Sequence, residues 1–165
     1  MVTSTTSPTA VAQAIMDAVN AHDVDTLVTH YADVIDERMP DRTIRSRAEL
    51  GEFMKELFAG VPDLRFEVHN MAEDGENVLI SWTITGTHRG TFNGIKATGG
   101  RLQIPGFEMM TIRDGKLVAN RVVFDRMGFG QQLGMLPADG SRQERGMKAA
   151  FNAATKLKSR FAERR

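Results

Sequence analysis

Hydrophobic side chains recur every three or four residues through the first third of the chain, which is the period of amphipathic helices. This pattern predicts a first helix after the Ser7-Pro8 pair and a short second helix that Asp23 caps and that includes Tyr31. A capping box at 46–49 opens a third, strongly amphipathic helix. A polar stretch over 36–45 separates the second helix from the third, and no strand is predicted there.

From Leu64 onward the hydrophobic period changes to two, which is typical of strands with one buried face. Two hairpin signals, Asp74-Gly75 and Asp114-Gly115, divide this region into successive strands. The glycine-rich segment 86–100 is expected to contain a bent strand and a long loop. Helices first and a long antiparallel sheet afterwards predict an α+β fold with four or more meandering strands.

The composition is that of an ordinary globular domain, with 165 residues, 41% hydrophobic and 25% charged. The chain has no cysteine, which excludes disulfides, thiol nucleophiles and thiolate metal sites. The first residues lack the basic and apolar regions of a signal peptide, and no apolar run is long enough to span a membrane. We therefore expect a cytoplasmic protein.

The last 25 residues differ from the rest in charge. Residues 141–165 contain eight Lys and Arg against two Glu, whereas the whole chain is neutral. Hydrophobic positions at steps of three and four, among them Met147, Phe151 and Phe161, predict a basic amphipathic helix beside a main domain over 1–140. We expect this helix to pack on the body or on a second copy. The alternatives are a membrane surface and a nucleic acid, although aromatic residues are not interleaved with basic ones as nucleic-acid binding would favour.

Short motifs in the body occur in an order and at spacings that resemble the SnoaL-like polyketide (ester) cyclases, a family of the nuclear transport factor 2-like superfamily. The resemblance covers about 23–137. The motifs are Tyr31-Ala32-Asp33, the segment 57–66, Gly86-Thr87-His88-Arg89-Gly90, the segment 113–118, Asp125-Arg126-Met127-Gly128 and Gln132-Leu133-Gly134.

The resemblance implies a cone-shaped half-barrel in which a curved, mostly antiparallel sheet wraps around the helices and encloses an apolar pocket. It also implies a homodimer formed through the outer face of the sheet. Such cyclases close a ring of an aromatic polyketide ester by intramolecular aldol addition, with no metal and no cofactor. The expected partner is therefore a small apolar or aromatic molecule, and an acid/base side chain moves the proton.

The chain departs from the family pattern at the catalytic positions. The last strand of the family commonly reads Glu-His-Trp-Asp, and Ala119-Asn120-Arg121-Val122 stands here, so Val122 occupies the aspartate position. Ketosteroid isomerases of the same superfamily carry a base just before a proline, where this chain has Met39. The isomerase mechanism of those enzymes is therefore disfavoured.

Glu108 is the candidate acid/base residue, because it stands in an otherwise mostly apolar strand. A three-residue turn at 113–115 would place Glu108 opposite Asn120 and on the face of Val122, where burial would raise its pKa. A two-residue loop would instead place Glu108 opposite Arg121 as a surface ion pair. The sequence leaves both registers open.

Two polar residues could assist Glu108. His88 could carry a proton, or could simply be exposed or hydrogen-bonded in its loop. Asn120 could donate to a substrate oxyanion or satisfy Glu108. The residues predicted to contact substrate, which could equally be plain core, are Tyr31, Trp82, Met110, Val122 and Phe124.

Three functions remain open at this point. The first is a cofactor-free cyclase or isomerase that acts on an apolar polycyclic carbonyl compound. The second is a non-catalytic protein that binds such a compound, which Val122 at the aspartate position would favour. The third is an interaction module that uses the helix over 141–165.

Overall fold

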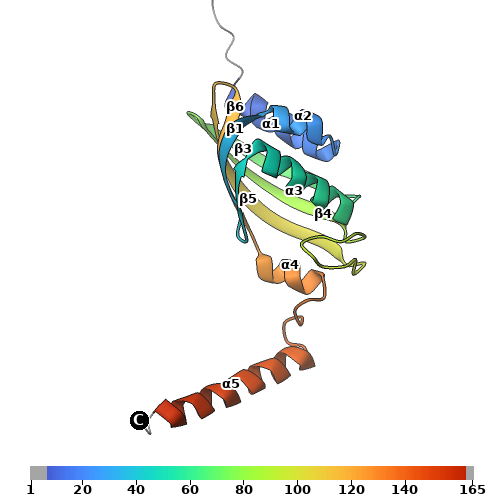
Figure 1. The fold of residues 1–165 in the computed structure, drawn as a ribbon, viewed down its shortest axis with the longest axis vertical. Helices are drawn as coiled ribbons and strands as arrows, with labels where there is room; N and C mark the ends of the chain where they lie inside the picture. Colours follow the sequence, from blue (N-terminus) through green and yellow to red (C-terminus); the bar gives the residue numbers. More distant parts are fainter. Residues whose placement is uncertain (1–6, 163–165) are drawn as a thin grey trace, which may run out of the picture.

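A curved six-stranded sheet wraps around three helices, as Figure 1 shows for this computed structural model, which describes residues 7–162 and their side chains as far as Lys156. The helices are α1 (Pro8–Asn20), α2 (Val24–Thr29), α3 (Arg47–Gly60), α4 (Arg126–Gln132) and α5 (Arg142–Ala162). The strands are β1 (Tyr31–Arg38), β2 (Thr43–Ser46), β3 (Arg65–Asp74), β4 (Asn77–Thr87), β5 (Arg101–Arg113) and β6 (Lys116–Phe124).

The strand order in the sheet is β2-β1-β6-β5-β4-β3. Every neighbouring pair is antiparallel except β1 and β6, which run parallel. The strands of the described chain form an open cone and do not close into a barrel. The predicted α+β half-barrel with a mostly antiparallel sheet and an additional C-terminal helix is therefore confirmed.

Local hydrogen bonds explain where the first three helices begin. The side chains of Ser7, Asp23 and Ser46 accept hydrogen bonds from backbone N–H groups of the first turns of α1, α2 and α3. Each bond satisfies a donor that the helix itself leaves unpaired, and such a cap contributes about 1 kcal/mol. The three predicted helix starts are correct.

The polar stretch between α2 and α3 forms the hairpin of β1 and β2, which the sequence pattern did not predict. Tyr31 begins β1 and does not belong to the second helix, contrary to expectation. The buried positions of β1 are Tyr31, Ile35 and Glu37, and a bulge between Val34 and Glu37 breaks the alternation. Because the outward-facing residues are polar and the bulge interrupts the alternation, the hydrophobic residues of β1 do not show the period of two that predicts a strand.

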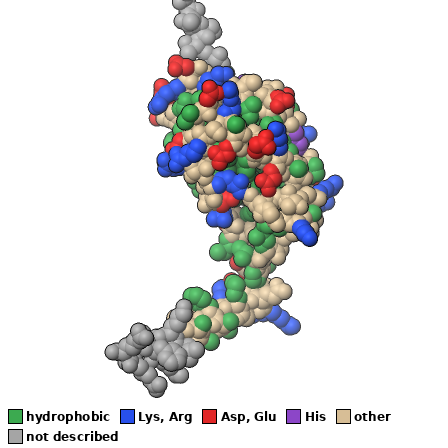
Figure 2. All heavy atoms as spheres, viewed as in Figure 1, with side chains coloured by type: hydrophobic (Ala, Val, Ile, Leu, Met, Phe, Trp, Pro, Cys, Tyr) green, Lys and Arg blue, Asp and Glu red, His purple; other side chains and the backbone are tan. Residues whose placement is uncertain are grey.

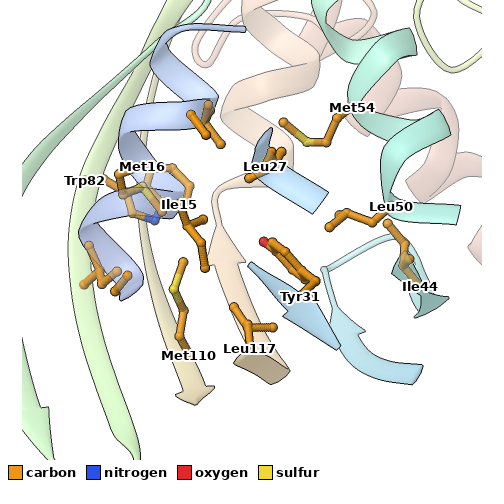
Figure 3. Close-up of a cluster of buried hydrophobic side chains, with 14 of the residues drawn as sticks. Ile15, Met16, Leu27, Tyr31, Ile44, Leu50, Met54, Trp82, Met110 and Leu117 are labelled. Carbon is orange, nitrogen blue, oxygen red and sulfur yellow. The ribbon is translucent and has the colours of Figure 1, made fainter. Parts of the chain in front are cut away.

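The alternating pattern after Leu64 was correctly predicted as strands. Val78, Ile80 and Trp82 of β4 are 2% exposed or less, and they face the helices. Figure 3 shows how side chains from α1, α2 and α3 meet those of the sheet in one cluster. Burial of each large aliphatic side chain in such a cluster contributes about 1.5–3 kcal/mol.

The outer face of the sheet carries exposed hydrophobic side chains at paired positions. Leu79 lies opposite Met109, and Phe107 lies opposite Val123, with exposures of 39–65%. An exposed apolar patch of this kind is typical of an interaction surface. The homodimer through the sheet face stays a prediction.

The helix α4 follows β6 directly and was not predicted. Asp125 caps it, because its Oδ1 accepts hydrogen bonds from the N–H groups of Met127 and Gly128, each at 3.0 Å. Phe129 of α4 packs against the core, and Leu133, which follows α4 directly, is part of the core.

The helix α5 extends away from the body (Figure 1). None of its described side chains is buried, and Met147 and Phe151 are 52% and 71% exposed. The described side chains of α5 thus make no buried contact with the body, and packing of this helix on the body or on a second copy stays a prediction. Figure 2 shows hydrophobic side chains near α4 and along α5, whereas charges of both signs cover the visible face of the body.

Within residues 7–162, no helix has both the length and the hydrophobicity needed to cross a membrane.

Candidate active site

A cavity of about 1090 Å³ lies between the concave face of the sheet and the helices α1 and α3. Its wall consists mainly of hydrophobic side chains, including several methionines and phenylalanines. The five residues predicted to contact substrate all line it, namely Tyr31, Trp82, Met110, Val122 and Phe124. Large, mainly apolar cavities with few polar groups are typical small-molecule sites.

Three polar side chains meet in this apolar wall. Asn120 Nδ2 donates one hydrogen bond to Glu108 Oε2 at 2.7 Å and another to Glu37 Oε1 at 3.0 Å. Glu37, Glu108 and Asn120 are 2%, 7% and 2% exposed. We call these three residues the carboxyl–amide–carboxyl group. They come from β1, β5 and β6, and the parallel pairing of β1 with β6 places Glu37 beside Asn120.

The register of β5 and β6 differs from both predicted alternatives. The loop has two residues, Asp114 and Gly115, but a bulge before Ile112 shifts the pairing beyond it. Glu108 consequently lies opposite Val122 and diagonal to Asn120, on the inner face of the sheet. Glu108 thus lies on the inner face of the sheet, as the three-residue turn would place it, but its partner is Val122 and not Asn120. The surface ion pair with Arg121, which the two-residue loop would give, does not form.

Burial changes the acidity of both carboxyl groups. Desolvation raises the pKa of Glu108 to about 7, and the Asn120 hydrogen bond and the nearby Trp82 indole offset part of the rise. Desolvation, followed by the charge of Glu108, raises the pKa of Glu37 to about 8. Both carboxyl groups therefore keep a proton to higher pH than an ordinary glutamate does, and their titrations are coupled.

Glu37 is the functional candidate that the sequence analysis missed. It stands between Asp36 and Arg38 in a stretch that reads as solvent-exposed, and its neighbours do form an exposed ion pair. The sequence does contain a signal for Glu37, because Tyr31, Ile35 and Glu37 are the inward-facing positions of β1. The bulge between Val34 and Glu37 interrupts their regular spacing, so a search for alternating residues does not find them. Only the pairing of β1 with β6 brings Glu37 to the site.

Both N–H bonds of the Asn120 amide are used by the two carboxyl groups. Asn120 therefore has no donor left for a substrate oxyanion and instead holds the two carboxyl groups in place. Within the part of the chain that the structure describes, four buried polar atoms of the site have no hydrogen-bond partner: Glu37 Oε2, Glu108 Oε1, Asn120 Oδ1 and Trp82 Nε1. Such atoms favour a bound polar group, because unpaired buried polar atoms are rare and costly.

Tyr31 adds a further polar tip to the site. Its ring is 5% exposed and points into the space between helices and sheet, as Figure 3 shows. Burial, and then the charges of Glu37 and Glu108, raise the pKa of the Tyr31 phenol well above its ordinary value. The hydroxyl therefore remains protonated and can donate a hydrogen bond.

His88 lines the same cavity but lies apart from Glu108. It follows the end of β4 and is 1% exposed, so it is not the exposed loop histidine of the alternative prediction. Glu108 pairs with Ile80, eight positions before His88, so the two residues are separated by up to roughly 26 Å along the chain at about 3.3 Å per residue. Direct assistance of His88 to Glu108 is not supported by this placement.

At the partly exposed edge of the cavity wall, Arg42 lies over the ring of Phe53, with 4.6 Å between the guanidinium carbon and the ring centre. Arg42 Nη2 also donates to Asn93 Oδ1, which joins the β1–β2 hairpin to the loop after β4. Phe53 and Phe92 pack at 6.0 Å between ring centres. The loop after β4 is therefore held over the cavity by contacts with the hairpin and α3.

The described residues contain no group of three or more His, Asp or Glu side chains arranged to hold a metal ion.

The fold and the site together define a class, namely an open α+β cone that encloses an apolar small-molecule cavity with buried acid groups. The sequence profile of the SnoaL-like polyketide cyclase family matches residues 9–133. The chain belongs to this family.

Solved structures share the fold of this chain. AclR of Streptomyces galilaeus, described as a proposed hydroxylase, is 26% identical, with a TM-score of 0.71 and coverage of 92% of this chain and 96% of AclR. A SnoaL-like polyketide cyclase from Agrobacterium tumefaciens is 22% identical, with a TM-score of 0.66 and coverage of 78% and 99%. TsrD of Streptomyces laurentii is 21% identical, with a TM-score of 0.69 and coverage of 76% and 93%. No curated protein matches the chain.

Proposed function

We propose that the protein is a cofactor-free cyclase or isomerase that moves a proton on an apolar polycyclic carbonyl compound. One observation carries this proposal: two buried carboxyl groups, Glu37 and Glu108, share one bridging amide in the wall of a large apolar cavity. A general base and a general acid close together can remove a proton next to a carbonyl and stabilise the resulting oxyanion.

Glu108 is assigned as the base. Its pKa of about 7 leaves a substantial ionised fraction at neutral pH, and Oε1 is not held by the Asn120 amide, which bonds Oε2. This Oε1 oxygen takes the proton from the carbon next to the substrate carbonyl. A carboxylate whose conjugate acid has a pKa near 7 is well suited to take a proton from substrate at neutral pH.

Glu37 is assigned as the acid. Its pKa of about 8 keeps it mainly protonated when Glu108 is ionised, and Oε2 has no protein partner. The Glu37 carboxyl group donates its proton to the carbonyl oxygen as the enolate forms, and the Tyr31 hydroxyl is a second donor on the same side of the cavity. The enol then attacks a second carbonyl of the same molecule in the cyclase reaction, or is reprotonated on carbon in an isomerase reaction.

The position of Val122 is compatible with this assignment. In the family pattern the corresponding residue is an aspartate, and Glu108 lies directly opposite Val122 on the neighbouring strand. A carboxyl group supplied from β5 is therefore presented close to the place where the family pattern has one on β6. The apolar residue at 122 also supports the burial that raises the pKa of Glu108.

The test is hydrogen exchange on a simple bicyclic ketone. With 2-tetralone in deuterated buffer, the protein should accelerate loss of the protons next to the carbonyl, with a rate that rises as Glu108 ionises through about pH 7. Glu108→Gln should lower this rate by about 10²–10⁴-fold, the usual contribution of a general base. Glu67→Gln, on the exposed face of β3, is the matched control and should leave it unchanged.

The second candidate is a non-catalytic protein that binds the same class of compound, and the hydrophobic Val122 favours it. Saturable binding of 2-tetralone without any exchange above buffer would support this candidate and contradict the enzyme. Binding is measured by thermal shift, since ligand at 100 times its dissociation constant adds about 2.7 kcal/mol of stability.

A further inference from the structure

We propose that His88 forms a second polar contact with the substrate, donating a hydrogen bond from Nε2 to a carbonyl or hydroxyl oxygen at the end of the ligand remote from Glu108. The identity of the ligand as a fused-ring carbonyl compound rests on the proposed function. The role of His88 itself rests on its hydrogen bonds and its position in the cavity wall.

The backbone around His88 holds the ring in a defined place. The His88 N–H donates to Gly100 O at 2.9 Å, and the Gly99 N–H donates to His88 O at 2.9 Å. His88 is 1% exposed and contributes to the wall of the 1090 Å³ cavity. The residue therefore combines a rigid backbone with a buried side chain at the ligand space.

The contacts with Thr98 determine which ring nitrogen carries the proton. The Thr98 backbone N–H donates to His88 Nδ1 at 3.3 Å. A peptide N–H can only donate, so Nδ1 must present a lone pair. In a neutral imidazole the other nitrogen then carries the hydrogen, which makes Nε2 the donor.

The Thr98 hydroxyl reinforces this arrangement. Its Oγ1 lies 3.2 Å from His88 Nδ1 and accepts a hydrogen bond from the Gly100 N–H, also at 3.2 Å. Thr98 Oγ1 thus accepts a hydrogen bond from the Gly100 N–H, and the hydroxyl hydrogen of Thr98 can be donated to His88 Nδ1. Two donors therefore converge on Nδ1, and protonation of that nitrogen would break both contacts.

The Nε2 donor lacks an acceptor. His88 Nε2 is buried and has no hydrogen-bond partner among the described residues. A donor that is already oriented and desolvated binds a ligand oxygen with little reorganisation, and a site built around it discriminates strongly against ligands without that oxygen.

The separation of the two polar sites determines the shape of the ligand. Eight residues, or up to roughly 26 Å of extended chain, separate His88 from Ile80, the partner of Glu108, and the curvature of the sheet shortens the direct path. A ligand that reaches both is elongated and carries oxygens at both ends. Fused aromatic rings with terminal carbonyl groups have this form, whereas a bicyclic ketone reaches only Glu108.

The first test measures the tautomer by long-range ¹H–¹⁵N spectroscopy of the histidine rings. The chain has four histidines, and His88→Met identifies the signal of His88 by its loss. We expect the neutral ring to carry its hydrogen on Nε2. A neutral ring with its hydrogen on Nδ1 would overturn the proposal.

The second test compares two ligands that differ by one hydroxyl oxygen on a terminal ring, 2,6-dihydroxyanthraquinone and 2-hydroxyanthraquinone. The protein should bind the dihydroxyquinone about tenfold more tightly, and the Nε2–H proton should shift downfield when the dihydroxyquinone is added. Equal affinity for the two compounds, or no binding of either, would contradict the proposal.

Two variants separate the contact from general packing. His88→Met should reduce the tenfold preference to nearly one, and an unchanged preference would overturn the proposal. Since His88 is buried and its replacement could prevent folding, Thr98→Val provides the second measurement. It retains the ring and the backbone N–H donor of residue 98 but removes the hydroxyl contact with Nδ1, so hydrogen should remain mainly on Nε2 and the preference should stay above about threefold.

These results are distinct from those that test the proposed function. A wrong tautomer together with normal hydrogen exchange on 2-tetralone would overturn only the role of His88. Absence of exchange together with the expected tautomer and dihydroxyquinone preference would overturn only the acid/base reaction and leave a ligand-binding protein.

Discussion

The indole ring of Trp82 on β4 lies directly across Gly106 on β5, and the two residues are partners in the antiparallel pair. A Cβ atom at Gly106 would lie 2.1 Å from Cη2 of the ring, well inside any permitted contact. Trp82 also lowers the pKa of Glu108. The glycine thus creates the space for a ring that forms both a wall of the cavity and part of the surroundings of the base.

We expect Gly106→Ala to displace Trp82 and destabilise the protein by about 1–3 kcal/mol, the usual cost of overpacking a core. Trp82 is the only tryptophan, so its fluorescence should change in the folded state as well as during urea unfolding. Gly146→Ala in α5 is the control, because no atom lies within 4 Å of its added Cβ. Equal midpoints for both variants would contradict the close packing described here.

Glu108→Gln should lower the pKa of Glu37, because the charge of Glu108 is one of the two causes that raise it to about 8. Burial remains in the variant, so the pKa should stay above the ordinary glutamate value of 4.5. Titration of ¹³C-labelled carboxyl groups measures this directly. An unchanged Glu37 titration would mean that the two carboxyl groups are not coupled.

Asn120→Leu should raise the pKa of both carboxyl groups, since the hydrogen bonds from Asn120 lower each of them. The leucine has a similar volume but no donor, so the effect reports the lost hydrogen bonds. The same carboxyl titration checks the result, with Asn70→Ala on the exposed part of β3 as control. A fall in either pKa would show that Asn120 does not hold the pair in this way.

The stability of the protein should decrease as pH rises from about 5 to about 8. Glu37 and Glu108 have raised pKa values in the folded state, so the folded protein binds more protons than the unfolded chain between pH 4.5 and pH 7–8. The stabilisation is complete below the unfolded pKa and is lost as pH rises through the folded values. Each pKa unit corresponds to about 1.4 kcal/mol, so the change amounts to a few kcal/mol.

Urea unfolding at several pH values measures this slope. The double variant Glu37→Gln with Glu108→Gln cannot ionise at these positions, and its stability should vary less over the same pH range. A wild-type curve parallel to that of the double variant would refute the raised acid pKa values.

Removal of α5 should leave the body unaffected, because none of the described side chains of this helix is buried. A chain that ends at Gly140 should unfold within about 0.5 kcal/mol of the full chain, as expected for changes away from the core. Light scattering of the two proteins shows whether the helix contributes to self-association. A large loss of stability at a concentration where both are monomers would contradict the isolated position of α5.

Much of the fold could be predicted from the sequence because it depends on local signals. Caps at Ser7 and Ser46 mark helix starts, and uninterrupted alternation along β4 and β5 marks strands with one buried face. The β1–β2 hairpin lacks such signals, because its exposed residues are charged and a bulge interrupts its inner positions. The orientation of α5 depends on contacts that its own periodicity does not contain.

Of the residues of the candidate site, too, only some could be predicted from the sequence. Glu108 could be identified because a carboxylate among hydrophobic residues is locally unusual, and its inward direction follows from the strand period. Glu37 could not, because Asp36 and Arg38 make it look like part of a charged surface. The bulge that shifts β5 against β6 also has no sequence signal in the Asp114-Gly115 turn, so the partner of Glu108 required the structure.

The parallel contact of β1 with β6 joins Glu37 to Asn120 across 83 positions of the chain. A refolding molecule therefore acquires the unusual acidity of Glu37 only when its first and last strands meet. Net proton uptake from a weakly buffered solution near pH 6.5 would then measure when β1 and β6 pair during refolding. The delay of this uptake after helix formation would show how late in folding the acid/base pair of the site is formed.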